Sequence, residues 1–530
     1  MPERTGSGSR MCAAIAALAG LTAAGDAVAQ TAAGAHGSAY QASGRCGPFP
    51  RAPLKTPPWL CVGIVAGPAH GLVMPRLIVE VGKNHFIVVD MGAWSPGRGR
   101  VLALHLDRDS KAHIKTLFDR LDVPHGLALG PDKRVYVGER SEIWRFDPAD
   151  PLGTRQSVRR GLPSAGLHRL KHFVFDTQGN IVVNLGAPTD RCEGQSASVQ
   201  WPCPTVEGDK PEAALWKLHL TWPEGRPGAF EPLARGLRNS VALAVHPGSG
   251  LLVQAENSVD LRTEEYPPEE LNIIRPGGHY GWPYCLGNNE LAQDYKGKGI
   301  VCSRYERPEV LVPAHAAPLG MTYYTGALFP ELKGKLLIAF HGYRRNGHRL
   351  AAYDTTKEGR PLAPAPRAGG LPGFPAEIVG GWQQMAGVRP RGAPVGLTMA
   401  ADGAIWFAED KNRTVMVLLR AAHAAADVPQ PPPKPRPRTS PPAVPEWAAF
   451  YGEVLTPHCS RCHEDFQTSD AKLAWRRLFE KDWLTAPLSS SSLFQSMLGE
   501  GGRRPMPPPD GATGDPGLLN RVRSFLRNRN

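Results

Sequence analysis

The sequence predicts a mainly β protein, a six-bladed β-propeller followed by a small all-α domain. Its 530 residues exceed what a single hydrophobic core usually holds, so two or more domains are expected. A two-strand pattern returns six times along the first four fifths of the chain. Beyond it the composition changes abruptly at a proline-rich tract, after which apolar residues recur at helical spacing.

Each of the six repeats combines an apolar alternating strand, a turn containing Gly, Asp or Asn, and a second strand rich in Val, Ile and aromatic residues. Six such units, with no helical segment of comparable strength between them, favour a propeller over a β-sandwich. We place the propeller at residues 43–422 and expect the wider gaps to be loops on one face. The repeats are Pro75–Met91, Pro124–Glu139, Leu170–Gly186, Val241–Glu256, Pro318–Gly342 and Pro394–Glu409.

The N-terminus has the order of a secretory signal peptide, which we place at residues 1–29. Arg4 and Arg10 precede an apolar run from Met11 to Leu21, and small residues end the segment. No other stretch approaches the roughly 20 apolar residues that span a membrane. The sequence therefore predicts export, to a bacterial periplasm, without a membrane-spanning segment.

Cysteine usage agrees with an oxidising compartment. Six cysteines remain once Cys12 in the signal and the two cysteines of a C-terminal motif are set aside, and they allow fifteen connectivities. Pairing of sequence neighbours is the simplest, giving Cys46–Cys61, Cys192–Cys203 and Cys285–Cys302. The net charge of +12 is scattered among acidic residues, which argues against a nucleic-acid partner.

A proline-rich linker is predicted at residues 423–445, because its Pro429–Arg438 core favours an extended, semi-rigid polyproline II spacer. Residues 446–530 then read as a small helical domain. One helix is expected before residue 459 and another after Asp515-Pro516. The second helix has five apolar residues predicted to share one face, Leu518, Leu519, Val522, Phe525 and Leu526.

A Cys-x-x-Cys-His motif lies between these helices, and it predicts covalent attachment of haem c through Cys459 and Cys462. His463 would be one axial ligand of the iron. Met506 is the candidate for the other, because methionine opposite histidine is the usual pairing in cytochromes c. A thioredoxin-like or zinc-binding pair is the alternative, but it lacks the βαβ context or the second ligand pair. The sequence thus predicts a cytochrome c domain.

Four strings in the propeller resemble the soluble glucose/sorbosone (aldose sugar) dehydrogenases that use pyrroloquinoline quinone (PQQ). The resemblance covers roughly residues 70 to 420, and its GGxYGWP string is quite specific. The strings are GLRNSVALA at 236–244, ELNIIRPGGHYGWP at 270–283, PAHAAPLG at 313–320 and AFHG at 339–342.

This resemblance implies a set of site residues. His168 matches the general base that takes the hydroxyl proton while hydride passes to PQQ, with His172 as a rival. Arg238 and Asn239 match the pair that contacts the quinone, with Arg238 also catalytic. The remaining matches are Ser258 and Val259, whose carbonyls would hold Ca²⁺, Arg389 and Arg391 over the PQQ carboxylates, and Arg344 or Arg345 in place of a quinone-contacting lysine.

The chain also departs from the family pattern. The carboxylate expected to orient the base falls at Ala187, with Asp190 as a possible substitute. The resemblance also places His125 at the mouth of the pocket, although a turn residue is an equal explanation. It further implies a second calcium site, for which solvated polar loops are an equal explanation, formed by Glu270, Tyr280, Asn288 and Glu290.

Two functions follow from these features. The first is a periplasmic PQQ dehydrogenase that oxidises a sugar, or a related alcohol or aldehyde, and passes electrons within the chain to haem c. Its external acceptor would be a cytochrome, a copper protein or a quinone-linked oxidase. The second is a cofactor-free propeller that docks an electron-transfer cytochrome c.

Overall fold

The computed structural model covers the propeller and parts of the C-terminal segment. The predicted signal peptide, and the predicted linker up to residue 442, lie outside the described residues. The structure describes residues 40–42, 44–194, 198–382, 392–421, 443–459, 466, 468–480, 483–484, 488, 491–498 and 517–527.

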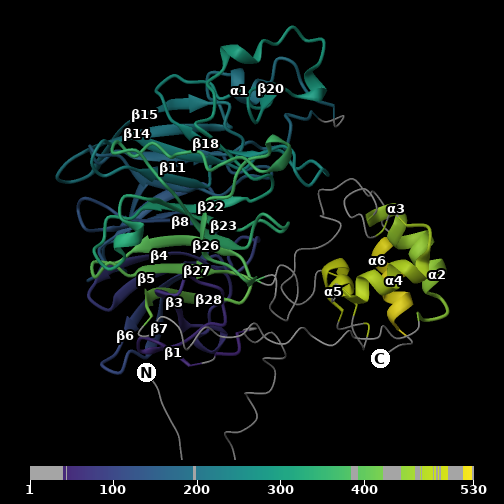
Figure 1. Ribbon diagram of the computed structural model, residues 1–530, viewed down its shortest axis with the longest axis horizontal. Coiled ribbons are helices and arrows are strands. Elements are labelled where there is room, and N and C mark those ends of the chain that lie inside the picture. The colour runs from purple at the N-terminus through teal and green to yellow at the C-terminus, as the bar shows by residue number, and fades with distance from the viewer. Residues whose placement is uncertain are drawn as a thin grey trace, which may run out of the picture. The chain divides into compact units, whose positions relative to one another are not determined.

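Six four-stranded antiparallel sheets form the blades of a β-propeller, as the sequence predicts (Figure 1). Each predicted repeat supplies the innermost and second strands of one blade. The first three blades contain β4 (Pro75–Gly82), β5 (His85–Asp90), β6 (Gly99–Leu106), β7 (Ala112–Leu121), β8 (Gly126–Leu129), β9 (Val135–Gly138), β10 (Glu142–Phe146), β11 (Gln156–Arg160), β12 (Phe173–Phe175), β13 (Ile181–Leu185), β14 (Ala214–Thr221) and β15 (Arg226–Arg235). The last three contain β16 (Ala242–Val245), β17 (Leu252–Glu256), β18 (Glu269–Ile273), β21 (Val310–Val312), β22 (Pro318–Tyr323), β23 (Leu336–Phe340), β24 (Arg349–Tyr353), β25 (Ala376–Val379), β26 (Pro394–Met399), β27 (Ile405–Glu409), β28 (Thr414–Arg420) and β3 (Leu60–Ala66).

The sixth blade takes its outer strand from the N-terminal side of the chain. β3 pairs with β28 in antiparallel register, with Val62 opposite Leu418, and so closes the ring. A short hairpin of β1 (Arg45–Cys46) and β2 (Phe49–Pro50) precedes β3. The predicted Cys46–Cys61 disulfide is confirmed, and it ties this hairpin to the closing strand.

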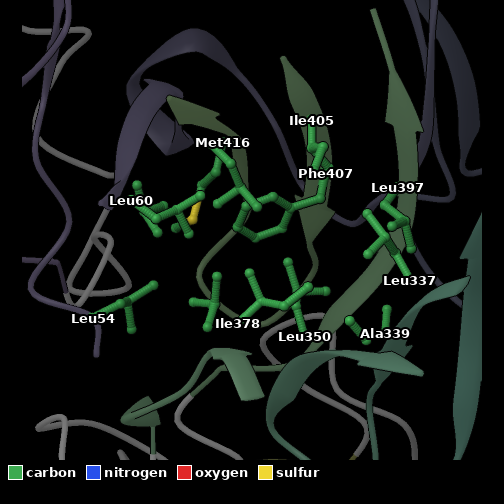
Figure 2. Close-up of a cluster of buried hydrophobic side chains, with 14 of the residues drawn as sticks. Leu54, Leu60, Leu337, Ala339, Leu350, Ile378, Leu397, Ile405, Phe407 and Met416 are labelled. Atoms are coloured by element: carbon green, nitrogen blue, oxygen red, sulfur yellow. The ribbon is translucent and has the colours of Figure 1, made fainter. Parts of the chain in front are cut away.

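The core between the fifth and sixth blades shows how the ring is packed. Figure 2 shows apolar side chains from β3, β27 and β28, among them Leu60, Phe407 and Met416, facing those of the fifth blade, including Leu350. Phe407 and Met416 are fully buried. Burial of this apolar surface favours the closed ring, because it removes the surface from water.

Two insertions extend the edge of the third and fourth blades. One follows β13 and contains α1 (Pro204–Glu207). The other follows β18 and contains β19 (Cys285–Leu286), β20 (Glu290–Leu291) and the short 3-10 helices η2 (Gln293–Tyr295) and η3 (Cys302–Arg304). α1 and β20 lie close together in Figure 1, and the insertions share an apolar cluster that includes Val259, Trp282 and Tyr284. The other two predicted disulfides, Cys192–Cys203 and Cys285–Cys302, are confirmed within them.

The C-terminal segment contains helices packed around their own apolar cluster. They are α2 (Trp447–Phe450), the π-helix η7 (Tyr451–Leu455), α3 (Thr456–Cys459), α4 (Ala471–Glu480), α5 (Ser492–Leu498) and α6 (Leu518–Leu526). In α6 the side chains of Leu518, Val522 and Leu526 are buried, as expected for four-residue spacing. The prediction for Leu519 is wrong: it is 42% exposed, because one residue corresponds to about 100° around a helix.

Among the described residues, no helix has both the length and the apolar character needed to cross a membrane.

Candidate active site

Several of the predicted site residues lie at one end of the propeller. Innermost and second strands are antiparallel, so Ala242 opposes Ala255 in the fourth blade and Pro394 opposes Glu409 in the sixth. Residues just before an innermost strand and just after a second strand therefore share one end of the propeller. The predicted residues found at that end are His168, Arg238, Asn239, Ser258, Val259 and Arg344.

His168 is half-buried in the loop before β12. Its Nδ1 lies 2.7 Å from the carbonyl oxygen of Ala187. Nδ1 therefore carries the proton and donates it, which leaves the lone pair on Nε2. Gly186 permits this approach, because a Cβ there would lie only 2.5 Å from the His168 carbonyl oxygen. A backbone carbonyl thus orients the imidazole at the position where a carboxylate was expected.

The His168 imidazole is held in its neutral form. Burial and the positive charge of Arg238 keep the pKa of His168 well below its usual value, and the hydrogen bond to Ala187 offsets only part of this effect. A neutral imidazole with a free lone pair has the state that a general base needs.

Arg238 is almost fully buried, with 3% of its surface exposed. Its Nη2 lies 2.5 Å from Oδ1 of Asp190 and 3.3 Å from Oδ2 of Asp260, and its Nη1 donates to the carbonyl of Asn257 over 2.8 Å. Asp190 therefore holds Arg238 and does not orient His168. Burial alone would lower the pKa of Arg238, but the carboxylate of Asp190 and that of Asp260 raise it above its usual value.

Asn239 presents an unused acceptor. Its backbone N–H donates to Oε1 of Glu256 over 3.0 Å, while its side-chain Oδ1 is buried and has no hydrogen-bond partner. An unpaired buried acceptor costs about 1–3 kcal/mol, so native proteins rarely retain one without a reason. A bound ligand with an N–H or O–H group would satisfy this atom.

The segment expected to hold calcium follows β17. Ser258 and Val259 are buried there, and the Ser258 N–H donates to Oε2 of Glu269 over 2.5 Å. Burial raises the pKa of Glu256 to about 7 and that of Glu269 to about 8. The oxygens of both carboxyl groups accept N–H groups, and the Val259 carbonyl accepts the N–H of Leu261 over 3.0 Å. Oxygen atoms are the ligands that Ca²⁺ prefers, and calcium binding at this segment stays a prediction.

Two residues of the second predicted calcium site have other hydrogen-bond partners. The Tyr280 hydroxyl donates to the Ile273 carbonyl over 2.6 Å, and Oδ1 of Asn288 accepts from Arg307 over 2.7 Å. No group of three or more His, Cys, Asp or Glu side chains suited to a metal occurs in the part of the chain that the structure describes.

Of the predicted cofactor contacts Arg344, Arg389 and Arg391, the structure describes Arg344. Arg344 donates from Nη2 to the Leu261 carbonyl over 2.8 Å and from Nη1 to the Thr263 carbonyl over 3.0 Å. It therefore fastens its loop to the segment that follows Val259. Arg389 and Arg391 lie outside the described residues.

His125 and His172 form a buried pair beneath these loops. Their rings are 5.7 Å apart in an edge-on arrangement, and neither Nε2 of His125 nor Nδ1 of His172 has a partner. Burial lowers the pKa of His172 to about 4 and, with the nearby charge of Arg76, holds that of His125 well below its usual value.

A cluster that the sequence analysis did not identify completes this end of the propeller. Arg76, His341 and Asp410 come from the first, fifth and sixth blades and meet through an ion pair and hydrogen bonds. The available signal was positional, because each lies at the edge of a repeat where site residues gather. His341 and Asp410 directly follow second strands, and Arg76 is the second residue of an innermost strand.

Of the predicted haem residues, the structure describes Cys459. It ends α3 and packs half-buried against the apolar cluster of the C-terminal helices. Cys462, His463 and Met506 lie outside the described residues.

Comparisons with known proteins identify the family of the chain and structures that share its fold. A family model described as TrAA12-like matches residues 64–421. A pyrroloquinoline quinone-dependent sugar dehydrogenase of Hypocrea jecorina is 26% identical over 402 residues, which cover 66% of this chain and 86% of that protein. An uncharacterized protein of Borreliella burgdorferi is 29% identical over 314 residues, which cover 53% of this chain and 76% of the relative.

Two solved structures share the fold. The calcium structure of the Trichoderma reesei family AA12 carbohydrate-active enzyme has a TM-score of 0.56 and 20% identity, covering 69% of this chain and 97% of that structure. The holo form of the pyranose dehydrogenase PQQ domain from Coprinopsis cinerea has the same TM-score, identity and coverage. At this identity the likeness concerns the fold alone.

The buried, neutral His172 makes stability depend on pH. Its pKa is about 4 when folded and about 6.5 when unfolded, so the unfolded state binds more protons between these values. Its contribution is therefore complete above pH 6.5 and is lost as the pH falls towards 4, by about 3 kcal/mol. Replacing His172 with Gln should reduce the acid-induced loss by that amount, measured by urea unfolding at pH 7 and pH 4. An equal loss in the variant and the wild type would contradict this assignment.

Proposed function

Because the chain belongs to the TrAA12-like family, we propose that it is a quinoprotein dehydrogenase. It uses PQQ and Ca²⁺ to oxidise a sugar, or a related alcohol or aldehyde, and passes the electrons to haem c in its own C-terminal domain. The observation that carries this proposal is the pairing of a neutral, oriented His168 with the buried Arg238. The names of the Hypocrea jecorina and Coprinopsis cinerea relatives support the cofactor and the substrate class.

PQQ, when bound, supplies a carbonyl group that accepts a hydride. The residues of the chain bind the substrate and the cofactor and accept the proton. Nε2 of His168 takes the substrate hydroxyl proton, while the Ala187 carbonyl keeps the required tautomer. Arg238 offers a fixed positive charge to the carboxylates of PQQ and to the oxygen that gains charge during reduction.

Calcium and the side chain of Asn239 would complete the binding site. The carbonyls of Ser258 and Val259 would hold the ion, because oxygen atoms are the ligands that Ca²⁺ prefers. The unpaired Oδ1 of Asn239 would accept a hydrogen bond from the cofactor. Arg389, Arg391 and Arg344 remain proposed contacts on the strength of the family resemblance.

We propose that the C-terminal helical domain accepts the electrons from the propeller. Haem c would be attached through Cys459 and Cys462, with His463 and Met506 as axial ligands. Its external acceptor would be a cytochrome, a copper protein or a quinone-linked oxidase. The predicted N-terminal signal peptide and the three disulfides support a periplasmic location.

Reconstitution of the full chain with PQQ and Ca²⁺ tests the proposal. Adding sugars one at a time should reduce the haem, observed through its visible bands. Exhaustive chelation should abolish this reduction without releasing haem, because the haem is bound covalently. Full sugar-dependent reduction after chelation would remove calcium from the mechanism, and failure to bind PQQ would favour the cofactor-free docking propeller.

Substitution of His168 tests the general base. His168→Gln keeps the volume but removes the proton acceptor, so sugar-driven haem reduction should fall by about 10²–10⁴-fold. Dithionite should still reduce the haem at the wild-type rate. Should His172→Gln abolish turnover while His168→Gln retains it, the assignment of the base is wrong.

Substitution of Met506 tests the haem ligation. A thioether ligand stabilises ferrous iron, so Met506→Ala should lower the reduction potential and shift the visible bands. Redox titration of the full chain measures the potential. An unchanged spectrum and potential would assign the sixth ligand to another residue.

A further inference from the structure

The cluster of Arg76, His341 and Asp410 contains an orienting carboxylate that His168 lacks. Nε2 of His341 lies 3.1 Å from Oδ1 and 3.2 Å from Oδ2 of Asp410. Oδ2 of Asp410 is also 2.5 Å from Nη1 of Arg76, and both side chains of this ion pair are only 2% exposed. The carboxylate is therefore fixed by a buried cation on one side and orients an imidazole on the other.

The charges around the cluster keep Asp410 ionised. Lys411 lies 4.0 Å from its Oδ1, and Nε of Arg76 donates to Nδ1 of His125 over 3.2 Å. Although burial opposes ionisation, Lys411, His341 and Arg76 together hold the pKa of Asp410 well below its usual value. Tyr343 completes the surroundings of His341, with ring centroids 5.7 Å apart.

His341 is neutral and has one available nitrogen. Because Nε2 donates its proton to the Asp410 carboxylate, the lone pair lies on Nδ1. Nδ1 makes no hydrogen bond with any described residue. It is also not one of the side-chain atoms that are both fully buried and without a hydrogen-bond partner. Burial lowers the pKa of His341 to about 4 although Asp410 opposes this shift.

Hydrogen bonds connect His341 to the predicted calcium segment. Its backbone N–H donates to the Ala317 carbonyl over 3.0 Å, and the Ala317 N–H donates to Oε1 of Glu269 over 3.2 Å. The other oxygen of Glu269 accepts from the N–H of Ser258. Three residues beyond His341, Arg344 fastens the same loop to the segment after Val259. His341 is thus tied to the proposed site by two independent routes.

The proposed reaction releases two protons at different steps. Oxidation of an alcohol to a carbonyl releases two electrons and two protons. One proton leaves the hydroxyl group directly, and His168 accepts it. The other travels with both electrons as the hydride. Haem iron takes one electron at a time and no proton, so the hydride's proton must be removed by a base as the electrons leave.

We propose that His341 is this second base, with Asp410 and Arg76 as its positioning residues. Nδ1 of His341 accepts the proton that arrived as hydride, and the resulting imidazolium is stabilised by the Asp410 carboxylate on Nε2. The imidazolium then releases the proton to solvent, so the two electrons and two protons of each turnover are accounted for. This inference rests on the proposed function, and it divides proton transfer between His168 and His341.

Rapid mixing of sugar with the reconstituted full chain separates the two steps. Absorbance of the bound PQQ follows hydride transfer, and the haem bands follow electron departure. His341→Gln should leave the PQQ phase within about twofold of the wild type and slow the haem phase by about 10²-fold or more. His168→Gln should slow both phases. His219→Gln is the matched control, because His219 forms a histidine–carboxylate pair with Glu231 on the outer strands, 2.8 Å apart.

Two further measurements guard against a merely structural effect. Added imidazole should restore the haem phase in His341→Ala, since a small base replaces the missing acceptor. In the apo protein, ¹⁵N-histidine NMR should show His341 protonated on Nε2, and Asp410→Asn should remove that preference.

The outcomes are distinguishable. Equal slowing of both phases in His341→Gln, an unchanged haem phase, or the absence of imidazole rescue would overturn the inference and leave the proposed function intact. No sugar-dependent change in either phase of the wild type would overturn the proposed function and the inference with it.

Discussion

Closure of the ring by the pairing of β3 with β28 is the constraint on which the candidate site depends. Cys61 and Arg420 meet across this pairing although they are 359 residues apart in sequence. The entropy of closing so long a loop grows only slowly with its length, and the apolar surface buried between blades offsets it. Closure also brings the sixth blade beside the first, and the ion pair of Arg76 and Asp410 spans that junction. The polar centre and the closure of the fold are therefore coupled.

Buried charge is the second feature that organises this end of the propeller. Arg238 and Arg76 are each matched by carboxylates, whereas Glu256 and Glu269 are buried carboxyl groups with raised pKa values. A buried ion pair contributes little net stability, because desolvation of both charges opposes their attraction. These ion pairs therefore fix the positions of their side chains more than they stabilise the fold.

Much of the fold could be predicted because its signals are local. The six repeats, their turns and the three disulfides between sequence neighbours all follow from short-range patterns, and the structure confirms them. Leu519 was misassigned because an apolar residue one position off a helical stripe looks like part of it. His341 and Asp410 were missed for a different reason. They are 69 residues apart, and their pairing depends on how neighbouring blades place the ends of their second strands.

The orientation of His168 marks the limit of reading a site from residue types. The sequence has Ala187 where a carboxylate was expected, which left the residue that orients the base undetermined. The structure supplies the same hydrogen bond from the Ala187 backbone carbonyl, a group that every residue carries and no sequence pattern displays. A carbonyl fixes the tautomer of an imidazole as a carboxylate does, but it carries no full negative charge to stabilise the imidazolium. The two histidines therefore differ in one physical respect: His168 lies near the positive charge of Arg238, whereas His341 donates to the negatively charged carboxylate of Asp410.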